Sequence, residues 1–368
     1  MKKALLTVLT AVFVLASTEA GACTTAVIGA GASESGRPML WKQRDTGNPF
    51  NVLVHIPAAD GRYAYTAVFN ADDLARNAVY AGSNEKGFAI INNMSYNLAK
   101  GTYDALNGSL MRRALESCAT VAEFEAMLRS EDPRTCEANF GVLDATGAAC
   151  YIEASDSVLV RYDVPEDGWL VRTNYSLAGS PEGSGYARYE TAVGLMERHR
   201  GKFTPEDLVD GLGRSYRNAV LGYDASRKFA GGFTYDEDFI PRPSTTSSVV
   251  IDGGDLMWVA IGYTPGAYMM PVRVSAGAAL PACLTPGEDG NAPANVLAEE
   301  IKKKTHHLGR DAGKKYVDFR VMRPVLRIVR RYEKAAADIY ARCGTDVEEM
   351  NRQLDALFAR FRDEIDSI

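Results

Sequence analysis

Alternating apolar and polar positions dominate the first part of the chain and predict an antiparallel β structure. The first two predicted strands, residues 23–30 and 38–44, are joined by a polar turn at 32–36 and form a hairpin. Further strands are predicted at 51–56, 63–69, 79–81, 88–92, 140–144, 150–154, 158–162 and 169–174. A second hairpin is predicted from 247–252 and 256–262, around Gly253-Gly254.

Helical periodicity separates these strands into groups. Amphipathic helices are predicted at 108–117, 121–130, 186–200 and 205–214, and Thr120 with Glu123 forms a capping box before the second. After Pro293 the chain becomes charged and helix-periodic, with helices expected at 294–304, 315–342 and 346–365. Pro324 should kink or restart the middle one. This order predicts an α+β fold with helical layers on antiparallel sheet, divided into residues 1–22, a main domain 23–292 and a helical C-terminal extension 293–368.

The first 22 residues have the three parts of a secretory signal peptide. Lys2 and Lys3 are followed by the apolar stretch 4–16 and by the small residues Ala20-Gly21-Ala22. Cleavage after Ala22 would make Cys23 the first residue, with a free α-amine beside its thiol. A terminal amine has an unperturbed pKa of about 7.7–8.0, so it can accept and return a proton near neutrality. Cys23 is therefore a candidate nucleophile activated by its own amine.

Two other interpretations of Cys23 compete with this one. It could be the lipid-acceptor cysteine of a lipoprotein, although Ala20 stands where such sites usually have a branched aliphatic residue. It could also be half of a disulfide, since export permits disulfides. Cys118 with Cys136 and Cys283 with Cys343 are possible pairs, but spacing does not determine connectivity. Cys150 is the remaining cysteine of the chain.

Composition narrows the classes of function. The net charge of the 368-residue chain is −6 at pH 7 with neutral histidines, and no basic stripe suggests a nucleic-acid partner. After the first 22 residues, no apolar run reaches the roughly 20 residues that span a bilayer. The four histidines form no metal-ligand pattern, so neither a metal nor another cofactor is expected.

Several short segments together resemble known families. They are Cys23-Thr24-Thr25-Ala26, Trp41-Lys42-Gln43-Arg44-Asp45, Asn84-Glu85-Lys86-Gly87 running to Asn92-Asn93, Val171-Arg172-Thr173-Asn174, Tyr186-Ala187-Arg188-Tyr189 and Thr246-Ser247-Ser248-Val249-Val250. In order and spacing this set resembles the N-terminal-nucleophile amidohydrolases of the choloylglycine hydrolase and penicillin V acylase family. It is also similar to the acyl-coenzyme A:isopenicillin N acyltransferase-like family. The resemblance covers roughly residues 23–271.

The resemblance implies a four-layer αββα sandwich and a set of site residues. Cys23 would be the nucleophile, Asp45 would hold its amine or thiol, and Asn174 with Asn93, or its neighbour Asn92, would donate to the oxyanion. Lys42 stands where the choloylglycine hydrolases have arginine, and it can stabilise a thiolate without arginine's bidentate geometry. Arg44 shares a strand face with Lys42 and is the alternative for that role.

The expected activity is hydrolysis of a small-molecule linear amide through a Cys23 thioester. N-acyl transfer and dipeptide hydrolysis by the same nucleophile are the alternatives, along with the lipid-anchored protein. Glu153 is expected to be an ion-pair partner or an exposed strand residue. Arg188 and Arg242 are weak candidates for pairing with a substrate carboxylate, and their expected positions are a surface helix and a loop. Aromatic and apolar candidates for an acyl pocket are Phe50, Phe69, Tyr96 and Phe140. A homo-oligomer is possible.

Overall fold

The N-terminal hairpin lies at the centre of the fold. In the computed structural model, which describes residues 22–99, 105–228, 233–235, 239–308 and 315–367, β1 (Thr24–Ile28) pairs with β2 (Met39–Asp45) as predicted. The hairpin belongs to a six-stranded antiparallel sheet of order β10-β1-β2-β14-β15-β16. Its other strands are β10 (Trp169–Arg172), β14 (Thr245–Asp252), β15 (Leu256–Ile261) and β16 (Met270–Arg273).

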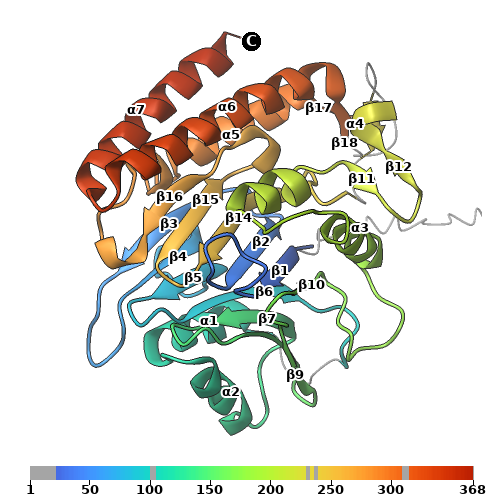
Figure 1. Ribbon diagram of the computed structural model, residues 1–368, viewed down its shortest axis with the longest axis vertical. Coiled ribbons are helices and arrows are strands. Elements are labelled where there is room, and N and C mark those ends of the chain that lie inside the picture. Colours follow the sequence, from blue (N-terminus) through green and yellow to red (C-terminus); the bar gives the residue numbers. More distant parts are fainter. Residues whose placement is uncertain (1–21, 100–104, 229–232, 236–238, 309–314, 368) are drawn as a thin grey trace, which may run out of the picture.

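A seven-stranded antiparallel sheet packs face to face against this first sheet (Figure 1). It runs in sequence order through β3 (Asn51–Ile56), β4 (Tyr65–Asn70), β5 (Ala81–Asn84), β6 (Ala89–Met94), β7 (Ala138–Leu143), β8 (Ala149–Ala154) and β9 (Leu159–Asp163). Its outer face is covered by α1 (Asn107–Ser117) and α2 (Val121–Ser130). The capping box of Thr120 and Glu123 forms as predicted.

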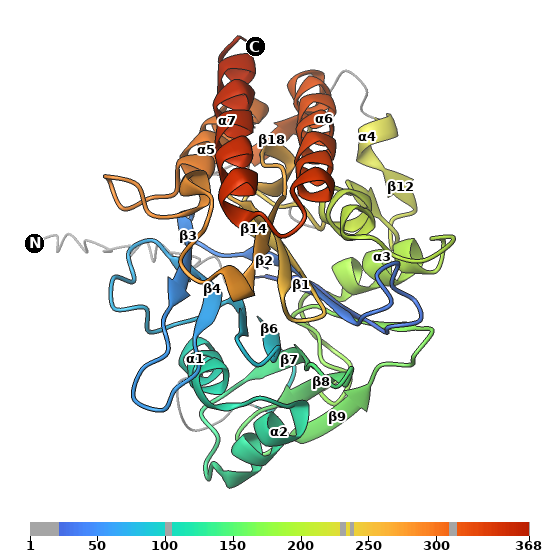
Figure 2. The ribbon, with the colours of Figure 1, turned by 60° about the vertical axis from the view of Figure 1, so that its left-hand side comes forward.

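Helices cover the outer face of the six-stranded sheet as well. They are α3 (Tyr186–Met196), a π-helical segment Asp207–Gly213, α5 (Pro293–Thr305), α6 (Phe319–Cys343) and α7 (Val347–Asp366). Figure 2 shows α6 and α7 side by side, on the side of the molecule opposite α1 and α2. The four layers are therefore helix, sheet, sheet, helix, which is the predicted αββα sandwich. Among the described residues, no helix has both the length and the apolarity that a membrane crossing demands.

The hairpin contributes to two hydrophobic cores because its residues alternate. Val27 and Leu40 point into the core between the sheets, whereas Ala26 and Trp41 pack under the helices of the outer layer. Successive strand residues face opposite sides of a sheet, so each strand residue is buried on one side or the other. All twelve residues of β1 and β2 are in fact buried, including Lys42, Arg44 and Asp45.

Several predicted elements differ from those observed. Residues 315–318 form a strand, β18 (Lys315–Asp318), in a small sheet with β13 (Phe233–Tyr235) and β17 (His306–Leu308), so the helix predicted at 315–342 begins at Phe319. That helix continues through Pro324 without restarting. The helix predicted at 205–214 is π-helical over 207–213, and the one predicted at 186–200 ends at Met196.

The remaining elements are short and were not predicted. They are the hairpin of β11 (Arg217–Asn218) and β12 (Tyr223–Asp224), the helix α4 (Ala225–Lys228), and the 3-10 turns Thr264–Gly266, Val274–Ala276 and Ala282–Leu284.

Candidate active site

Cys23 opens into a cavity of about 360 Å³ beside the end of the central hairpin. The β1–β2 register pairs Thr24 with Gln43 and Thr25 with Lys42, so one further step sets Cys23 opposite Arg44. Directly opposed residues share a face of the sheet, and alternation brings Lys42 to that same face. The Cys23 Sγ lies 3.9 Å from the carbonyl oxygen of Asp45.

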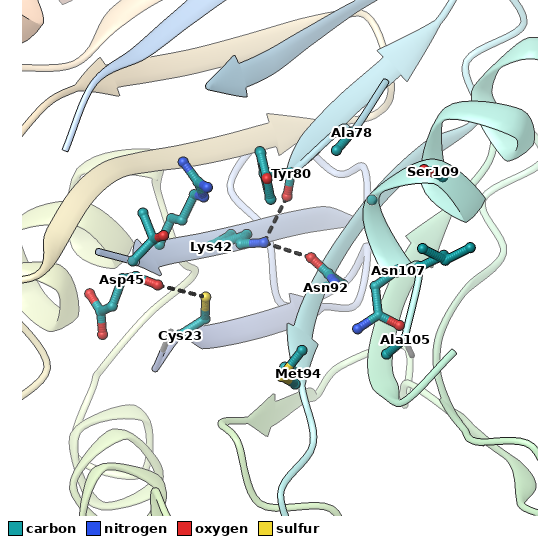
Figure 3. A pocket seen from close by; sticks show the side chains of 14 residues that line it. Cys23, Lys42, Asp45, Ala78, Tyr80, Asn92, Met94, Ala105, Asn107 and Ser109 are labelled. Carbon is teal, nitrogen blue, oxygen red and sulfur yellow. Dashed lines mark hydrogen bonds between the residues drawn. The ribbon is translucent and has the colours of Figure 1, made fainter. Parts of the chain in front are cut away.

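The cavity is built from four separate parts of the chain (Figure 3). The hairpin supplies Cys23 and residues 42 and 44–46, the approach to β5 supplies Ala78 and Tyr80, β6 supplies Asn92 and Met94, and the start of α1 supplies residues 105–109. Gly108 lets α1 approach closely, because a Cβ there would lie 2.7 Å from the Ala78 Cβ. No sequence motif marked Tyr80, Met94 or the α1 residues, which are separated by tens of residues from the hairpin.

Lys42 crosses from the hairpin to the second sheet. Its Nζ donates to the carbonyl oxygen of Tyr80 at 2.8 Å and to Asn92 Oδ1 at 2.7 Å, as Figure 3 shows. Burial lowers the pKa of Lys42 to about 8, while the nearby Cys23 acts in the opposite direction. Because an ammonium can only donate, Lys42 holds the Asn92 amide with its Oδ1 atom toward the lysine and its Nδ2 group away from it.

Arg44 lies beside Lys42 and is also buried. Its guanidinium donates to the Oδ1 atoms of Asn51 and Asn70, the latter at 2.8 Å, and its Cζ lies 3.5 Å from the centre of the Tyr80 ring. Burial lowers the pKa of Arg44, partly offset by Tyr80 and Cys23. Both cations weighed from the sequence therefore line the cavity with Cys23.

Asp45 ends β2 with a buried side chain. Its Oδ1 accepts a hydrogen bond from Thr245 Oγ1 at 2.6 Å, at a bulge where β14 meets β2. The carboxylate is thus positioned by a strand two hundred residues later in the chain, and it adds a negative charge to a group of cations that includes Lys42 and Arg188.

The two asparagines chosen from the resemblance are buried outside the cavity wall. Asn93 accepts from Thr25 Oγ1 at 3.3 Å and donates to the carbonyl oxygen of Thr173. Asn174 donates to the carbonyl oxygen of Met94 at 2.8 Å. Of the adjacent pair 92–93, the structure places Asn92 on the cavity wall.

Arg188 is a correction to the sequence analysis, because it is buried and not part of a surface helix face. Its guanidinium donates to the carbonyl oxygen of Cys23 at 2.6 Å, to Thr24 Oγ1 at 3.0 Å and to Asn174 Oδ1 at 2.8 Å. Burial lowers its pKa to about 10, opposed chiefly by Asp45. Arg188 thereby connects α3 to the backbone of Cys23 and determines the orientation of the Asn174 amide. The motif around it was noted, but only the packing of α3 on the hairpin reveals this contact.

Glu153 is a buried ion-pair partner, one of the two possibilities considered. Its Oε1 accepts from Arg172 Nε at 2.5 Å, and the backbone N–H groups of Leu177 and Ala178 donate to its carboxylate. The carboxylate and guanidinium tie β8 to β10 across the two sheets, so they support the fold behind the site.

The aromatic residues suggested for an acyl pocket take other positions. Phe69 and Phe140 belong to the central core, and Phe50 packs against it. Tyr96 is near Cys23, and burial raises its pKa to about 12. The apolar side chains at the cavity are instead those of Met94 and Leu106, which are 39% and 53% exposed.

The described cysteines form no disulfide, so neither of the two possible pairs is present. Cys118 and Cys136 are buried in the central core, and the Cys283 Sγ contacts the Met270 Sδ at 3.5 Å. Within the described part of the chain, no group of three or more histidine, cysteine or acidic side chains is placed to hold a metal ion.

Comparisons with known proteins bear on the family. The family model described as acyl-coenzyme A:6-aminopenicillanic acid acyl-transferase matches residues 59–201. A search of curated protein sequences gives no significant match. Because the matched range begins after the hairpin, it does not include Cys23, Lys42 or Asp45.

Three enzymes are among the solved structures that match part of the chain. They are an N-acylethanolamine-hydrolyzing acid amidase ortholog from Caenorhabditis elegans (17% identity, 63% of this chain and 93% of that chain, TM-score 0.43), a conjugated bile acid hydrolase from Clostridium perfringens (13%, 69% and 93%, 0.41) and a penicillin V acylase from Agrobacterium tumefaciens (16%, 69% and 86%, 0.39). Over residues 59–201 the chain resembles the acyl-coenzyme A:6-aminopenicillanic acid acyl-transferase family, which agrees with the acyltransferase-like resemblance of its motifs.

Proposed function

We propose that the protein is an exported cysteine amidohydrolase that cleaves a linear, non-peptide amide through a thioester on Cys23. The observation that carries the proposal is the position of Cys23 directly before β1, at a cavity that is also lined by Lys42, Arg44 and Asp45. In the full-length chain the Cys23 nitrogen is bound to Ala22. Signal cleavage after Ala22 would release it as the amine that the reaction needs.

The first half of the reaction forms the acyl-enzyme. The Cys23 sulfur attacks the amide carbon and its proton passes to the terminal amine, which returns it to the leaving nitrogen as the C–N bond breaks. In the second half, water attacks the thioester, the amine takes its proton, and the C–S bond breaks to release the carboxylic acid and regenerate the thiol. Lys42 stabilises the thiolate through its positive charge.

Asn92 is the side chain we assign to the oxyanion. Its Oδ1 is held by Lys42, so its Nδ2 group faces away from the lysine at the cavity wall. A donor already oriented before the substrate arrives needs no reorganisation when negative charge develops on the carbonyl oxygen. Met94 and Leu106 provide apolar surface at the same cavity for part of the substrate.

The alternative reactions share the nucleophile. An amine that reached the thioester before water would make the protein an N-acyltransferase, and a dipeptide in the cavity would make it a dipeptidase. Hydrolysis is preferred for an exported protein because the periplasm lacks acyl-coenzyme A. Lipid anchoring is disfavoured because Cys23 is 8% exposed and lies within the cavity wall, with its sulfur 3.9 Å from the carbonyl oxygen of Asp45.

The test combines mass spectrometry with turnover. Intact mass and N-terminal sequencing of the exported protein should give an unmodified chain that begins at Cys23, whereas an added diacylglycerol would indicate the lipoprotein. The mature protein should then hydrolyse members of a library of acyl-amides, acylated amino acids, bile-salt conjugates and dipeptides, and Cys23→Ala should not. Equal turnover by both proteins would refute the catalytic assignment.

A further inference from the structure

Arg44 is a buried cation that lines the cavity and has no role in the proposed reaction. Four arginines are fully buried among the described residues: Arg44, Arg172, Arg188 and Arg214. Arg172 pairs with Glu153, and Arg214 pairs with Glu333 at 2.6 Å. Arg188 donates to the backbone and side chains around Cys23 and does not line the cavity.

The recorded partners of Arg44 are all neutral. They are the amide oxygens of Asn51 and Asn70 and the ring of Tyr80. Lys42, the second cation of the cavity, likewise binds a backbone carbonyl and an amide oxygen. Within the described residues neither cation has a carboxylate at ion-pair distance. Asp45 also lines the cavity, but it is the leading attractive charge acting on Arg188, whereas Cys23 acts more strongly than Asp45 on Lys42 and Arg44. Burying a cation without an anion is costly, so the cavity favours the entry of a negative group.

With Asp45 counted against Arg188, a thiolate on Cys23 neutralises one of the two cations, Lys42 and Arg44. Lys42 suffices for it, and it is bonded to Asn92, the proposed oxyanion donor. The overall charge of the chain is −6, so a general attraction of anions to the surface is not expected. The positive charge that remains is local to the cavity and lies across the hairpin from the sulfur.

We propose that Arg44 is a specificity residue that selects acyl-amides carrying a carboxylate, in either the acyl or the amine half. This inference rests on the proposed function for the identity of the reaction, but not for the anion site itself. The planar guanidinium matches a carboxylate with two parallel hydrogen bonds, and its two asparagine partners and the Tyr80 ring hold it in place. Arg44 and Cys23 line the same cavity from opposed positions of the hairpin, so a substrate carboxylate bound there shares the cavity with the attacking thiol.

The anion site can be tested without any turnover. Iodoacetate and iodoacetamide are nearly equal in size and alkylate the same thiol, but only iodoacetate is negative. Peptide mass spectrometry gives the alkylation rate of Cys23 by iodoacetate divided by its rate with iodoacetamide. Divided by the same ratio for free cysteine, this normalised ratio should be on the order of 10 to 100, the range for a charge-assisted hydrogen bond. A ratio at or below that of free cysteine overturns the proposal, whether or not any amide is cleaved.

Three variants assign the effect to Arg44. Arg44→Met should bring the normalised ratio to near 1, and Arg44→Lys, which keeps the charge but not the two parallel hydrogen bonds, should keep only part of it. Arg327→Met, on the exposed side of α6, removes the same formal charge away from the cavity and should leave the ratio unchanged. Thermal unfolding checks that each variant is folded. An unchanged ratio in folded Arg44→Met overturns the proposal, and if that variant does not fold, the wild-type ratio still decides.

Matched substrates then identify the half that carries the charge. The amine arm compares N-acylglycine with its methylamide, and the acyl arm compares a succinic monoamide with the corresponding butyric amide. The arm containing the true substrate class should show about 10- to 100-fold higher kcat/KM for the charged member, and Arg44→Met should reduce that preference. Equal kcat/KM for charged and neutral members in both arms overturns the inference while leaving the hydrolase intact. No turnover of any amide, with a high iodoacetate ratio, instead refutes the proposed reaction and supports the anion site.

Discussion

Replacing Lys42 separates the effect of its charge from the effect of its burial. The side chain is 2% exposed, and burial lowers its pKa from 10.5 to about 8. This difference corresponds to about 3 kcal/mol of unfavourable free energy for the charged form. With a pKa of about 8, roughly nine-tenths of the molecules carry the Lys42 charge at pH 7 and roughly one-tenth at pH 9.

The activity of the wild-type protein should therefore decline on the alkaline side, with a midpoint near 8. The decline follows the loss of the Lys42 proton, which removes the cation beside the Cys23 thiol. The terminal amine acts in the opposite direction, because it must be neutral to accept a proton and its unperturbed pKa is about 7.7–8.0. The arginine of Lys42→Arg keeps its charge at every accessible pH. This variant should therefore keep the increase in activity caused by deprotonation of the terminal amine and lose the alkaline decline.

Lys42→Met tests the same reasoning through stability. It removes the cation and the contact that orients Asn92, so kcat should fall by about 10²–10³, the usual cost of an oxyanion donor. Its free energy of unfolding at pH 7 should be up to about 3 kcal/mol higher, because the charged form no longer has to be buried. The unfolded chain binds the Lys42 proton more tightly than the folded one, so this advantage should shrink as the pH rises from about 8 to 10.5.

The assays are pH profiles of kcat/KM and urea unfolding at several pH values, on proteins with identical N-termini. An alkaline decline with the same midpoint in wild type and Lys42→Arg would show that another group causes it. Full activity in Lys42→Met would remove Lys42 from the mechanism. A stability difference that does not change with pH would mean that burial does not shift the pKa of Lys42.

Three further predictions follow from single contacts. Arg188→Met should lower kcat by about 10- to 100-fold because the carbonyl of Cys23 loses its anchor, and steady-state kinetics of the folded variant would contradict this if kcat were unchanged. Glu153→Gln should reduce the free energy of unfolding by about 3 kcal/mol, since it leaves Arg172 buried without its carboxylate; urea denaturation measures this, and a loss below about 1 kcal/mol would argue against the pair. Thr120→Ala should cost about 1 kcal/mol by removing the cap of α2, with kcat/KM unchanged as the control.

Local pattern was enough for much of the fold. The hairpin of β1 and β2, the strands of the second sheet and the capped helix α2 depend on alternation, turn residues and a capping box that lie within a few residues of one another. The order of strands and helices then indicated the layered α+β architecture. By contrast, residues 315–318 form a strand because they pair with β13 and β17, and a short charged segment contains no record of such distant partners.

The same contrast between local pattern and distant contacts divides the residues of the candidate site into two groups. The sequence by itself determined that Cys23, Lys42, Arg44 and Asp45 would meet, because one hairpin of period two brings its two ends together. Tertiary structure decided that Asn92 and not Asn93 reaches the cavity, and that Arg188 is buried against Cys23. Which face of a strand or helix meets a second layer depends on how whole sheets and helices pack. That packing minimises exposed apolar area over the entire chain, so no short stretch of residues can specify it.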